Sequence, residues 1–253
     1  MPGDGQSIAI FALMALAAMF AGISKGGFGS GAAFASAAIL ALVMPPGMAL
    51  GIMLPLLMLI DLATLKPYWR KWSWPDARVL VLGALPGVAL GAWLYRQADA
   101  DLLRLLIGVI SLGFVLWQIS RRAGLLRPPK RPMPVWGGAC AGLIAGFTSF
   151  VSHAGGPPAA VYLLSRGLGK TPFQATTVLV FWLVNIAKFI PYAMLGMFTF
   201  ETLKINLALA PFALMGAWLG VKAHLLVSER AFFAITYVLL SLTGAKLIWD
   251  GIM

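Results

Sequence analysis

Two glycine-rich stretches place polar side chains inside apolar sequence, and the first combines a cation with hydroxyls. It reads GISKGGFGSG at 22–31 and contains Lys25. Glycine lets the backbone turn sharply and approach a ligand closely, and the free N–H groups at the start of a helix attract negative charge. The next apolar run starts near Gly31, so a helix there would direct its positive end at this turn. The sequence therefore predicts an anion site, and its expected residues are Ser24, Lys25, Gly26, Gly27, Gly29, Ser30 and Gly31.

The second stretch, TSFVSHAGGPP at 148–158, offers hydroxyl and imidazole donors beside two glycines. Pro157 and Pro158 would open the next helix in its first turn, where proline is tolerated. If both stretches form turns inside the membrane, they face one another from opposite sides and hold a small anion between them. The residues expected to do so here are Ser149, Ser152, His153, Gly155 and Gly156.

Three further polar residues lie inside apolar runs. Asn185 and Lys188 are three residues apart and share one helix face. An ionisable side chain at that depth costs at least about 2.5 kcal/mol, which makes Lys188 a functional candidate. Asp61 either pairs with nearby Lys66 or carries a coupling proton. We expect Asn185 and Lys188 to line the site or the route to it.

Structural explanations for the same residues remain open. The glycines would also allow close packing between membrane helices. Lys25 would extend to the cytoplasmic interface if the run before it is a full span. His153 would serve as a neutral hydrogen-bonding residue, and Lys188 would be satisfied by an internal salt bridge or a carbonyl oxygen.

The composition of the chain indicates an all-α polytopic membrane protein. The chain is 60% hydrophobic and 11% charged, and its apolar stretches approach the length needed to cross a hydrocarbon core of about 30 Å. The first run is expected to belong to the mature protein, and the single cysteine, Cys140, excludes a disulfide framework. Ten segments are predicted, at 8–23, 31–43, 47–65, 77–95, 102–119, 135–148, 156–165, 173–196, 203–222 and 230–249.

The net charge of +11 comes mostly from loops between the segments, where the positive-inside rule explains it better than nucleic-acid binding does. The loops 66–78 and 120–134 are strongly basic and are predicted to be cytoplasmic. Counting spans from these loops leaves both termini outside. No nucleic-acid partner is expected.

An internal repeat divides the chain. LIDLATLKPY at 59–68 aligns with LVNIAKFIPY at 183–192, an offset of 124 that also matches Asp61 with Asn185. Five segments per half is an odd number, so the second half is predicted to be inverted relative to the first. The predicted parts are repeat 1 (1–123), a basic cytoplasmic linker (124–134) and repeat 2 (135–253). The first two segments of each half are short, and we favour a re-entrant hairpin over two thin spans.

Inverted repeats are typical of secondary transporters, which hold their substrate near the midplane between the halves. The sequence has no Walker motif, no catalytic triad and no metal-ligand spacing. We therefore predict no enzymatic activity, no cofactor and no bound metal. A duplicated membrane protein without transport activity remains the structural alternative.

Four stretches make the chain resemble the TauE/SafE family of membrane proteins (sulfite exporters and toluene sulfonate uptake permeases). They are GISKGGFGSG at 22–31, LIDLATLKPYWRKW at 59–72, HAGGPPAAVYLL at 153–164 and GKTPFQATTVLVFWLVNIAKFIPY at 169–192. The resemblance implies transport of a small sulfur-containing anion, such as sulfite or an organosulfonate, across the bacterial cytoplasmic membrane. The expected partners are that anion and the lipid bilayer. An anion channel, a carrier of another small organic anion, and a homodimeric assembly all remain open.

Overall fold

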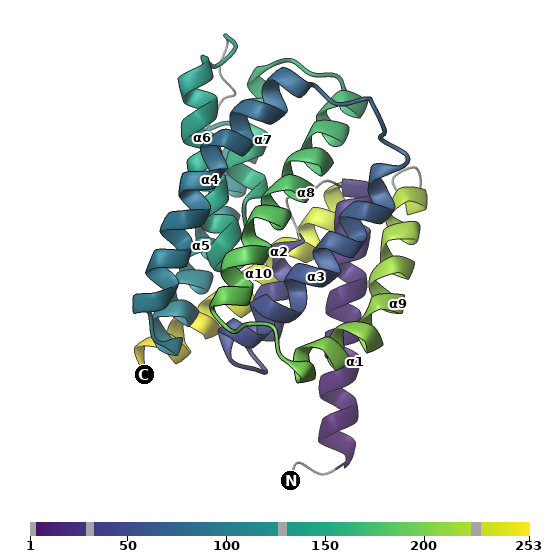
Figure 1. The fold of residues 1–253 in the computed structure, drawn as a ribbon, viewed down its shortest axis with the longest axis vertical. Coiled ribbons are helices and arrows are strands. Elements are labelled where there is room, and N and C mark those ends of the chain that lie inside the picture. Colours follow the sequence, from purple (N-terminus) through teal and green to yellow (C-terminus); the bar gives the residue numbers. More distant parts are fainter. Residues whose placement is uncertain (1–3, 29–32, 126–130, 224–228) are drawn as a thin grey trace.

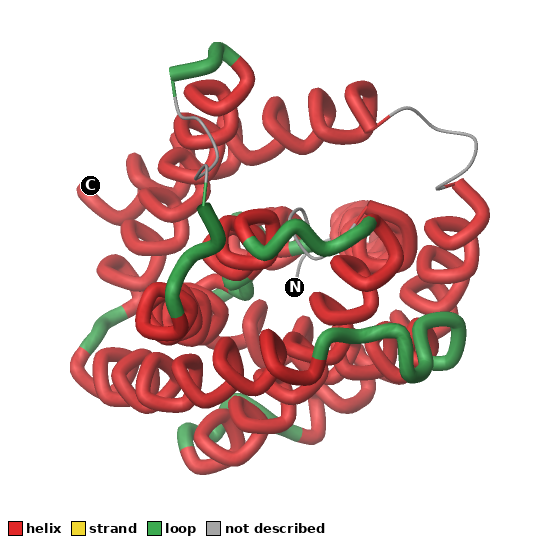
Figure 2. Tube along the Cα trace, turned by 90° about the horizontal axis from the view of Figure 1, so that it is seen from above, coloured by secondary structure: helices red, strands yellow, loops and turns green. Residues whose placement is uncertain are grey.

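The computed structural model describes residues 4–28, 33–125, 131–223 and 229–253, which form helices joined by turns and contain no strand (Figures 1 and 2). Each of the ten predicted segments coincides with one α-helix. The elements are α1 (Asp4–Ile23), the π-helical turn η1 (Ser24–Phe28), α2 (Phe34–Ala41), α3 (Pro46–Leu65), α4 (Trp74–Gln97), α5 (Ala100–Arg122), α6 (Val135–Ser152), α7 (Gly156–Ser165), α8 (Lys170–Met194), α9 (Phe200–Ala223) and α10 (Glu229–Ile252).

Eight helical stretches are long and apolar enough to cross a membrane, whereas α2 and α7 are not. The prediction that the first segment of each half is short is wrong. The first candidate span runs from Ile8 to Gly27, and α6 continues to Ser152. In the first stretch, Gly22, Gly26 and Gly27 pack against the backbone of α9. Each half therefore begins with a full-length helix followed by a half-length one.

Local signals in the sequence explain several helix starts. Pro46 and Pro157 lie in the first turns of α3 and α7, where the missing proline N–H costs nothing. The side chain of Asp99 accepts a hydrogen bond of 2.8 Å from the backbone N–H of Leu102 and so caps α5. These ends keep unpaired backbone groups out of the apolar part of the molecule.

The charged connections and the termini lie at opposite ends of the molecule. Figure 1 shows the α3–α4 and α7–α8 connections at one end and both termini toward the other. Exposed tryptophans lie near helix ends, as expected for a protein that crosses two membrane–water interfaces; Trp69, Trp74, Trp136 and Trp249 are examples. The orientation itself, with the basic α3–α4 connection in the cytoplasm, stays a prediction.

Glycine stripes bring two helix pairs into close contact. Helix α1 packs against α9 and α4 packs against α6. In α6, Gly142 and Gly146 lie against the backbone of α4, while Gly216 and Gly220 of α9 lie against the backbone of α1. Small residues spaced by four positions let membrane helices approach to backbone contact. The glycines at the α1–α9 and α4–α6 contacts are therefore packing residues.

We expect Gly142→Val to lower the free energy of unfolding by at least about 1–3 kcal/mol. A Cβ at this position collides with the carbonyl oxygen of Leu80. Gly113→Val is the matched control, since a Cβ at Gly113 meets no atom within 4 Å. Thermal unfolding in detergent would compare the two variants. Equal melting temperatures would contradict the packing described here.

Helices α3 and α8 contact each other, and they carry the buried residues Asp61, Asn185 and Lys188. The short helices lie against them, α2 on α3 and α7 on α8. The turn η1 and the α6–α7 turn both contribute residues to one interior cavity. This arrangement positions the candidate site.

Candidate functional site

The first glycine-rich stretch carries its lysine into the interior. Lys25 lies in the π-helical turn that follows α1, and only 3% of it is exposed. Its ammonium forms an ion pair with Asp61 of α3, which is fully buried. Lys25 therefore does not extend to the cytoplasmic interface, and its charge is compensated within the protein. Asp61 pairs with Lys25 rather than with Lys66.

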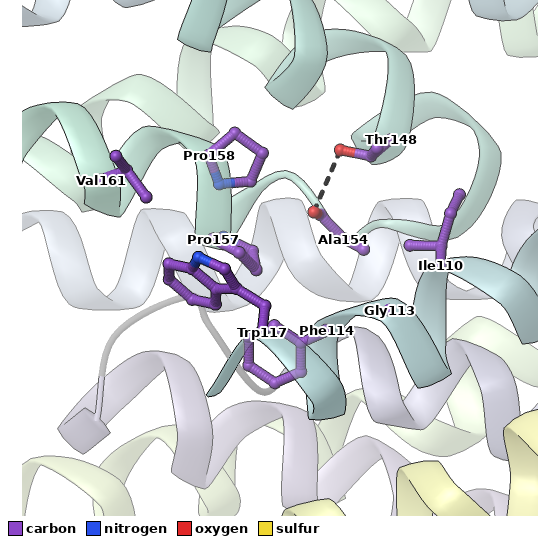
Figure 3. Close-up of a pocket in the computed structure, with 9 residues that line it drawn as sticks. All are labelled: Ile110, Gly113, Phe114, Trp117, Thr148, Ala154, Pro157, Pro158 and Val161. Carbon is purple, nitrogen blue, oxygen red and sulfur yellow. Dashed lines mark hydrogen bonds between the residues drawn. The ribbon is translucent and has the colours of Figure 1, made fainter. Parts of the chain in front are cut away.

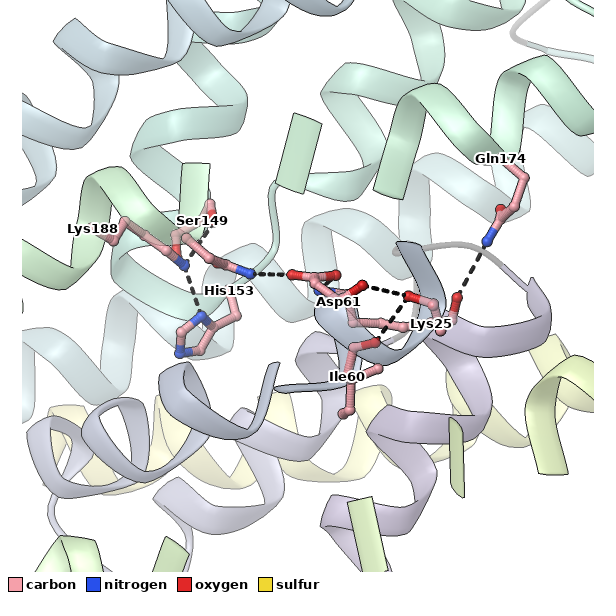
Figure 4. A network of polar contacts seen from close by, with 9 residues as sticks. Lys25, Ile60, Asp61, Ser149, His153, Gln174 and Lys188 are labelled. Carbon is pink, nitrogen blue, oxygen red and sulfur yellow. Dashed lines mark hydrogen bonds and ion pairs between the residues drawn. The ribbon is translucent and has the colours of Figure 1, made fainter. Parts of the chain in front are cut away.

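The two halves meet at Asp61. One carboxylate oxygen faces Lys25 (Figure 4). The other accepts a hydrogen bond of 2.7 Å from the side-chain amide of Asn185. Asp61 and Asn185 are the residues that the offset of 124 aligns. The carbonyl oxygen of Lys25 accepts a further hydrogen bond of 3.2 Å from Gln174 at the start of α8. A π-helical turn frees backbone groups of this kind, and such turns are frequent at functional sites.

The second glycine-rich stretch binds the other buried lysine. Lys188 of α8 is fully buried, and its ammonium donates hydrogen bonds of 3.0 Å to both the carbonyl and the hydroxyl oxygen of Ser149. It also lies 2.9 Å from Nδ1 of His153 (Figure 4). The partners of Lys188 are neutral, and in the part of the chain that the structure describes it forms no ion pair with a carboxylate.

His153 occupies an unusual backbone conformation. It ends α6 with φ 58° and ψ 13°, in the left-handed region that non-glycine residues seldom adopt. Because an ammonium can only donate, Nδ1 of His153 accepts from Lys188, and the ring proton then lies on Nε2. Nε2 faces the carbonyl oxygen of Leu50 at 3.3 Å. The geometry favours a neutral imidazole that links the α6–α7 turn to α3.

A small cavity joins the two turns. Its volume is about 10 Å³, and it lies between Lys25, Ser149, His153 and Asn185. That is room for about one water molecule. The apolar side of the cavity is formed by Ala33, Leu57 and Phe181.

The structure brings together only part of the predicted binding set. Six predicted residues form the polar cluster around the cavity: Lys25, Asp61, Ser149, His153, Asn185 and Lys188.

The remaining predicted residues that the structure describes do not line the cavity. Gly26 and Gly27 pack against the α9 backbone, and Gly155 packs against Phe181. Ser152 donates to the carbonyl oxygen of Thr148 in its own helix. Ser24 is fully buried, and Gly156 is buried at the first position of α7. Gly29, Ser30 and Gly31 lie outside the described residues.

Comparison with known families agrees with this architecture. The family model described as sulfite exporter TauE/SafE matches residues 14–247, which is most of the chain. The chain belongs to the TauE/SafE family. This is a family of membrane transporters, and the eight candidate spans identify a multi-pass membrane protein. The comparisons with curated proteins and with solved structures found no match.

In this TauE/SafE protein, three residues at the site have no distinctive local signal in the sequence. Gln174 lies one turn into α8, where a polar residue is unremarkable, yet it contacts the Lys25 turn. Leu50 takes part through its backbone carbonyl, which no side-chain pattern reveals. Phe181 lines the cavity from a run of apolar residues.

A second polar network, also not predicted, lies where α4 begins, α7 ends and α8 begins. Asp76 is nearly buried and accepts hydrogen bonds from Ser73 (2.6 Å), Tyr162 (3.1 Å) and Arg166 (2.8 Å). The backbone N–H of Ser73 donates to the hydroxyl of Thr176 at 2.9 Å. The network ties the start of α4 to the end of α7 and to the first part of α8.

Proposed function

We propose that this chain is a secondary transporter of a small sulfur-containing oxyanion, either sulfite-like or an organosulfonate, across the bacterial cytoplasmic membrane. The anion is bound at the polar cluster formed by Lys25, Asp61, Ser149, His153, Asn185 and Lys188. The remaining residues of the predicted set, including Ser24 and the glycine backbone, act as supporting donors or packing elements.

The charge of the cluster carries this proposal. Two buried ammonium groups, Lys25 and Lys188, are accompanied by one carboxylate, Asp61. With a neutral His153, the cluster has one positive charge in excess. An isolated buried charge is costly in a medium of low polarity. A bound anion supplies the missing negative charge, and charge-assisted hydrogen bonds from ammonium groups are among the strongest that an oxyanion can accept.

The hydrogen bonds between the halves supply a mechanism. Asn185 bonds Asp61, His153 bonds the carbonyl of Leu50, and Gln174 bonds the carbonyl of Lys25. An oxyanion is larger than the 10 Å³ cavity, so binding requires these contacts between halves to separate. We propose that they open toward one side of the membrane at a time.

Two inverted repeats, 1–123 and 135–253, joined by the linker 124–134, are the architecture that we propose for this movement. Helix pairing supports it: the first helix of each half packs against the fourth helix of the other half, α1 on α9 and α6 on α4. Such repeats hold the substrate at their interface while one half moves against the other.

Asp61 is the proposed coupling group. Its negative charge neutralises Lys25 in the described conformation. A proton on Asp61 would leave both lysines uncompensated and so would favour anion binding. Proton and anion would then cross the membrane together.

Flux measurements in proteoliposomes would test the function. We expect saturable uptake of labelled sulfite or a sulfonate, weak uptake of acetate, and net accumulation when a pH gradient is imposed. A channel of the same architecture would instead equilibrate the anion without following the pH gradient. Absence of flux for every sulfur oxyanion would contradict the proposal.

A further inference from the structure

An apolar groove of about 280 Å³ lies between α5 and the α6–α7 turn (Figure 3), and none of the residues that line it belongs to the polar cluster. Helix α5 contributes Ile110, Gly113, Phe114 and Trp117, and α7 contributes Pro157 and Val161. The hydroxyl of Thr148, at the inner end, is bonded to the carbonyl oxygen of Ala154 at 3.1 Å. The surface of the groove is therefore apolar, and the hydroxyl of Thr148 already has a hydrogen-bond partner.

The groove exists because the second short helix is less enclosed than the first. Helix α2 packs against α5 and α10 as well as α1 and α3, whereas α7 packs mainly against α6 and α8. At Gly113, which is exposed, a Cβ would meet no atom within 4 Å. Open space at an exposed glycine, facing two rigid prolines, allows a long flexible chain to lie there.

The groove is short enough to lie within one leaflet of the bilayer. From Ile110 to Trp117 the helix rises about 10 Å, and half of a hydrocarbon core is about 15 Å. The inner end lies at the α6–α7 turn, and the other end points along α5 toward its cytoplasmic terminus. An acyl chain from the cytoplasmic leaflet has this direction and this reach.

A cation lies beyond the cytoplasmic end of the groove. The guanidinium of Arg121, one turn past Trp117, lies 5.0 Å from the centre of the Trp117 ring that lines the groove. The neighbouring Arg122 instead lies over Tyr237 of α10, also at 5.0 Å. Basic residues at the cytoplasmic end of an intramembrane groove attract anionic lipid headgroups.

We propose that this groove binds one acyl chain of an anionic phospholipid from the cytoplasmic leaflet, with the headgroup paired to Arg121. The site is separate from the polar cluster, since Ser149 and His153 face Lys188 while Thr148 and Ala154 face the groove. The bound chain packs behind the α6–α7 turn and supports it. The proposal does not depend on which anion the protein transports.

Native mass spectrometry of the delipidated full chain, titrated with phosphatidylglycerol or phosphatidylcholine, would test the site. We expect one phosphatidylglycerol to be retained preferentially. Gly113→Phe, which fills the open space, should abolish this retention. Arg121→Gln should weaken it by about 5-fold, the effect of one cation near an anionic headgroup.

Two neighbouring residues of α5 provide matched controls. Arg122→Gln removes the same charge on the α10 side, and Leu116→Phe adds an aromatic ring at an exposed position outside the groove. Both should retain phosphatidylglycerol as the unaltered protein does. Equal retention of the two lipids together with no effect of Arg121→Gln would overturn the proposal. The proposal would also be overturned if the unaltered protein were a dimer and the Gly113→Phe variant a monomer. The groove would then be an interface between two copies.

Discussion

Replacing Lys188 with methionine is expected to reduce anion flux to the level of protein-free liposomes while the protein remains folded. The substitution keeps the length of the side chain but removes the positive charge that Asp61 does not neutralise. Without this charge, the cluster contains one ammonium and one carboxylate, so it is neutral while Asp61 is ionised and attracts an anion poorly. The measurement is uptake of labelled sulfite and sulfonate by reconstituted protein.

The stability of Lys188→Met should be unchanged or higher. Within the described residues, the ammonium of Lys188 is bonded to neutral groups, Ser149 and His153. A buried charge without a counter-charge is costly, so removing it should not destabilise the fold. Loss of flux with an unchanged melting temperature would therefore reflect the site rather than the fold.

Lys170→Met is the matched control for this variant, because Lys170 is exposed at the first position of the same helix. The control removes an equal charge far from the cluster and should transport normally. Binding provides a second readout, since a ligand of the folded state raises its apparent stability. Substantial flux through Lys188→Met, or a full thermal shift with sulfite, would contradict the role assigned to Lys188.

The helices of this protein could be predicted from the sequence because the bilayer determines them. Apolar runs bounded by polar or glycine-rich stretches identified all ten, and charge placed the basic α3–α4 connection at the end opposite both termini, as Figure 1 shows. The burial of Asn185 and Lys188 followed from their depth and spacing on one helix face. Local sequence is sufficient for properties of this kind.

The contacts between the halves could not be predicted in the same way. The repeat aligned Asp61 with Asn185. Their hydrogen bond, however, depends on the relative position of α3 and α8 along their axes, which no sequence pattern encodes. The glycines were ambiguous for a related reason. Gly26 and Gly27 suit both a turn and a close helix contact, and only the position of α9 distinguishes the two. Lys25 appeared unpaired because its partner, Asp61, lies 36 residues later in the chain.

Asp61→Asn is the second substitution for which we expect a large effect, and its first consequence concerns stability. The amide keeps the shape of the side chain but leaves Lys25 buried without a counter-charge. Removing one partner of a buried ion pair costs about 3–5 kcal/mol. Thermal unfolding should show this loss, and adding Lys25→Met in the same chain should recover most of it. Asp101→Asn, in the more exposed Asp101–Arg104 pair, should have no measurable effect.

The second consequence of Asp61→Asn concerns coupling, and it separates a transport role for the ion pair from a structural one. An amide at this position cannot take up or release a proton, so the charge of the cluster no longer changes during the cycle. We expect anion exchange across proteoliposomes to persist, while an imposed pH gradient no longer drives net accumulation. A purely structural carboxylate would lower both activities in parallel with the amount of folded protein. Accumulation that still follows the pH gradient in Asp61→Asn would assign the coupling proton to another group.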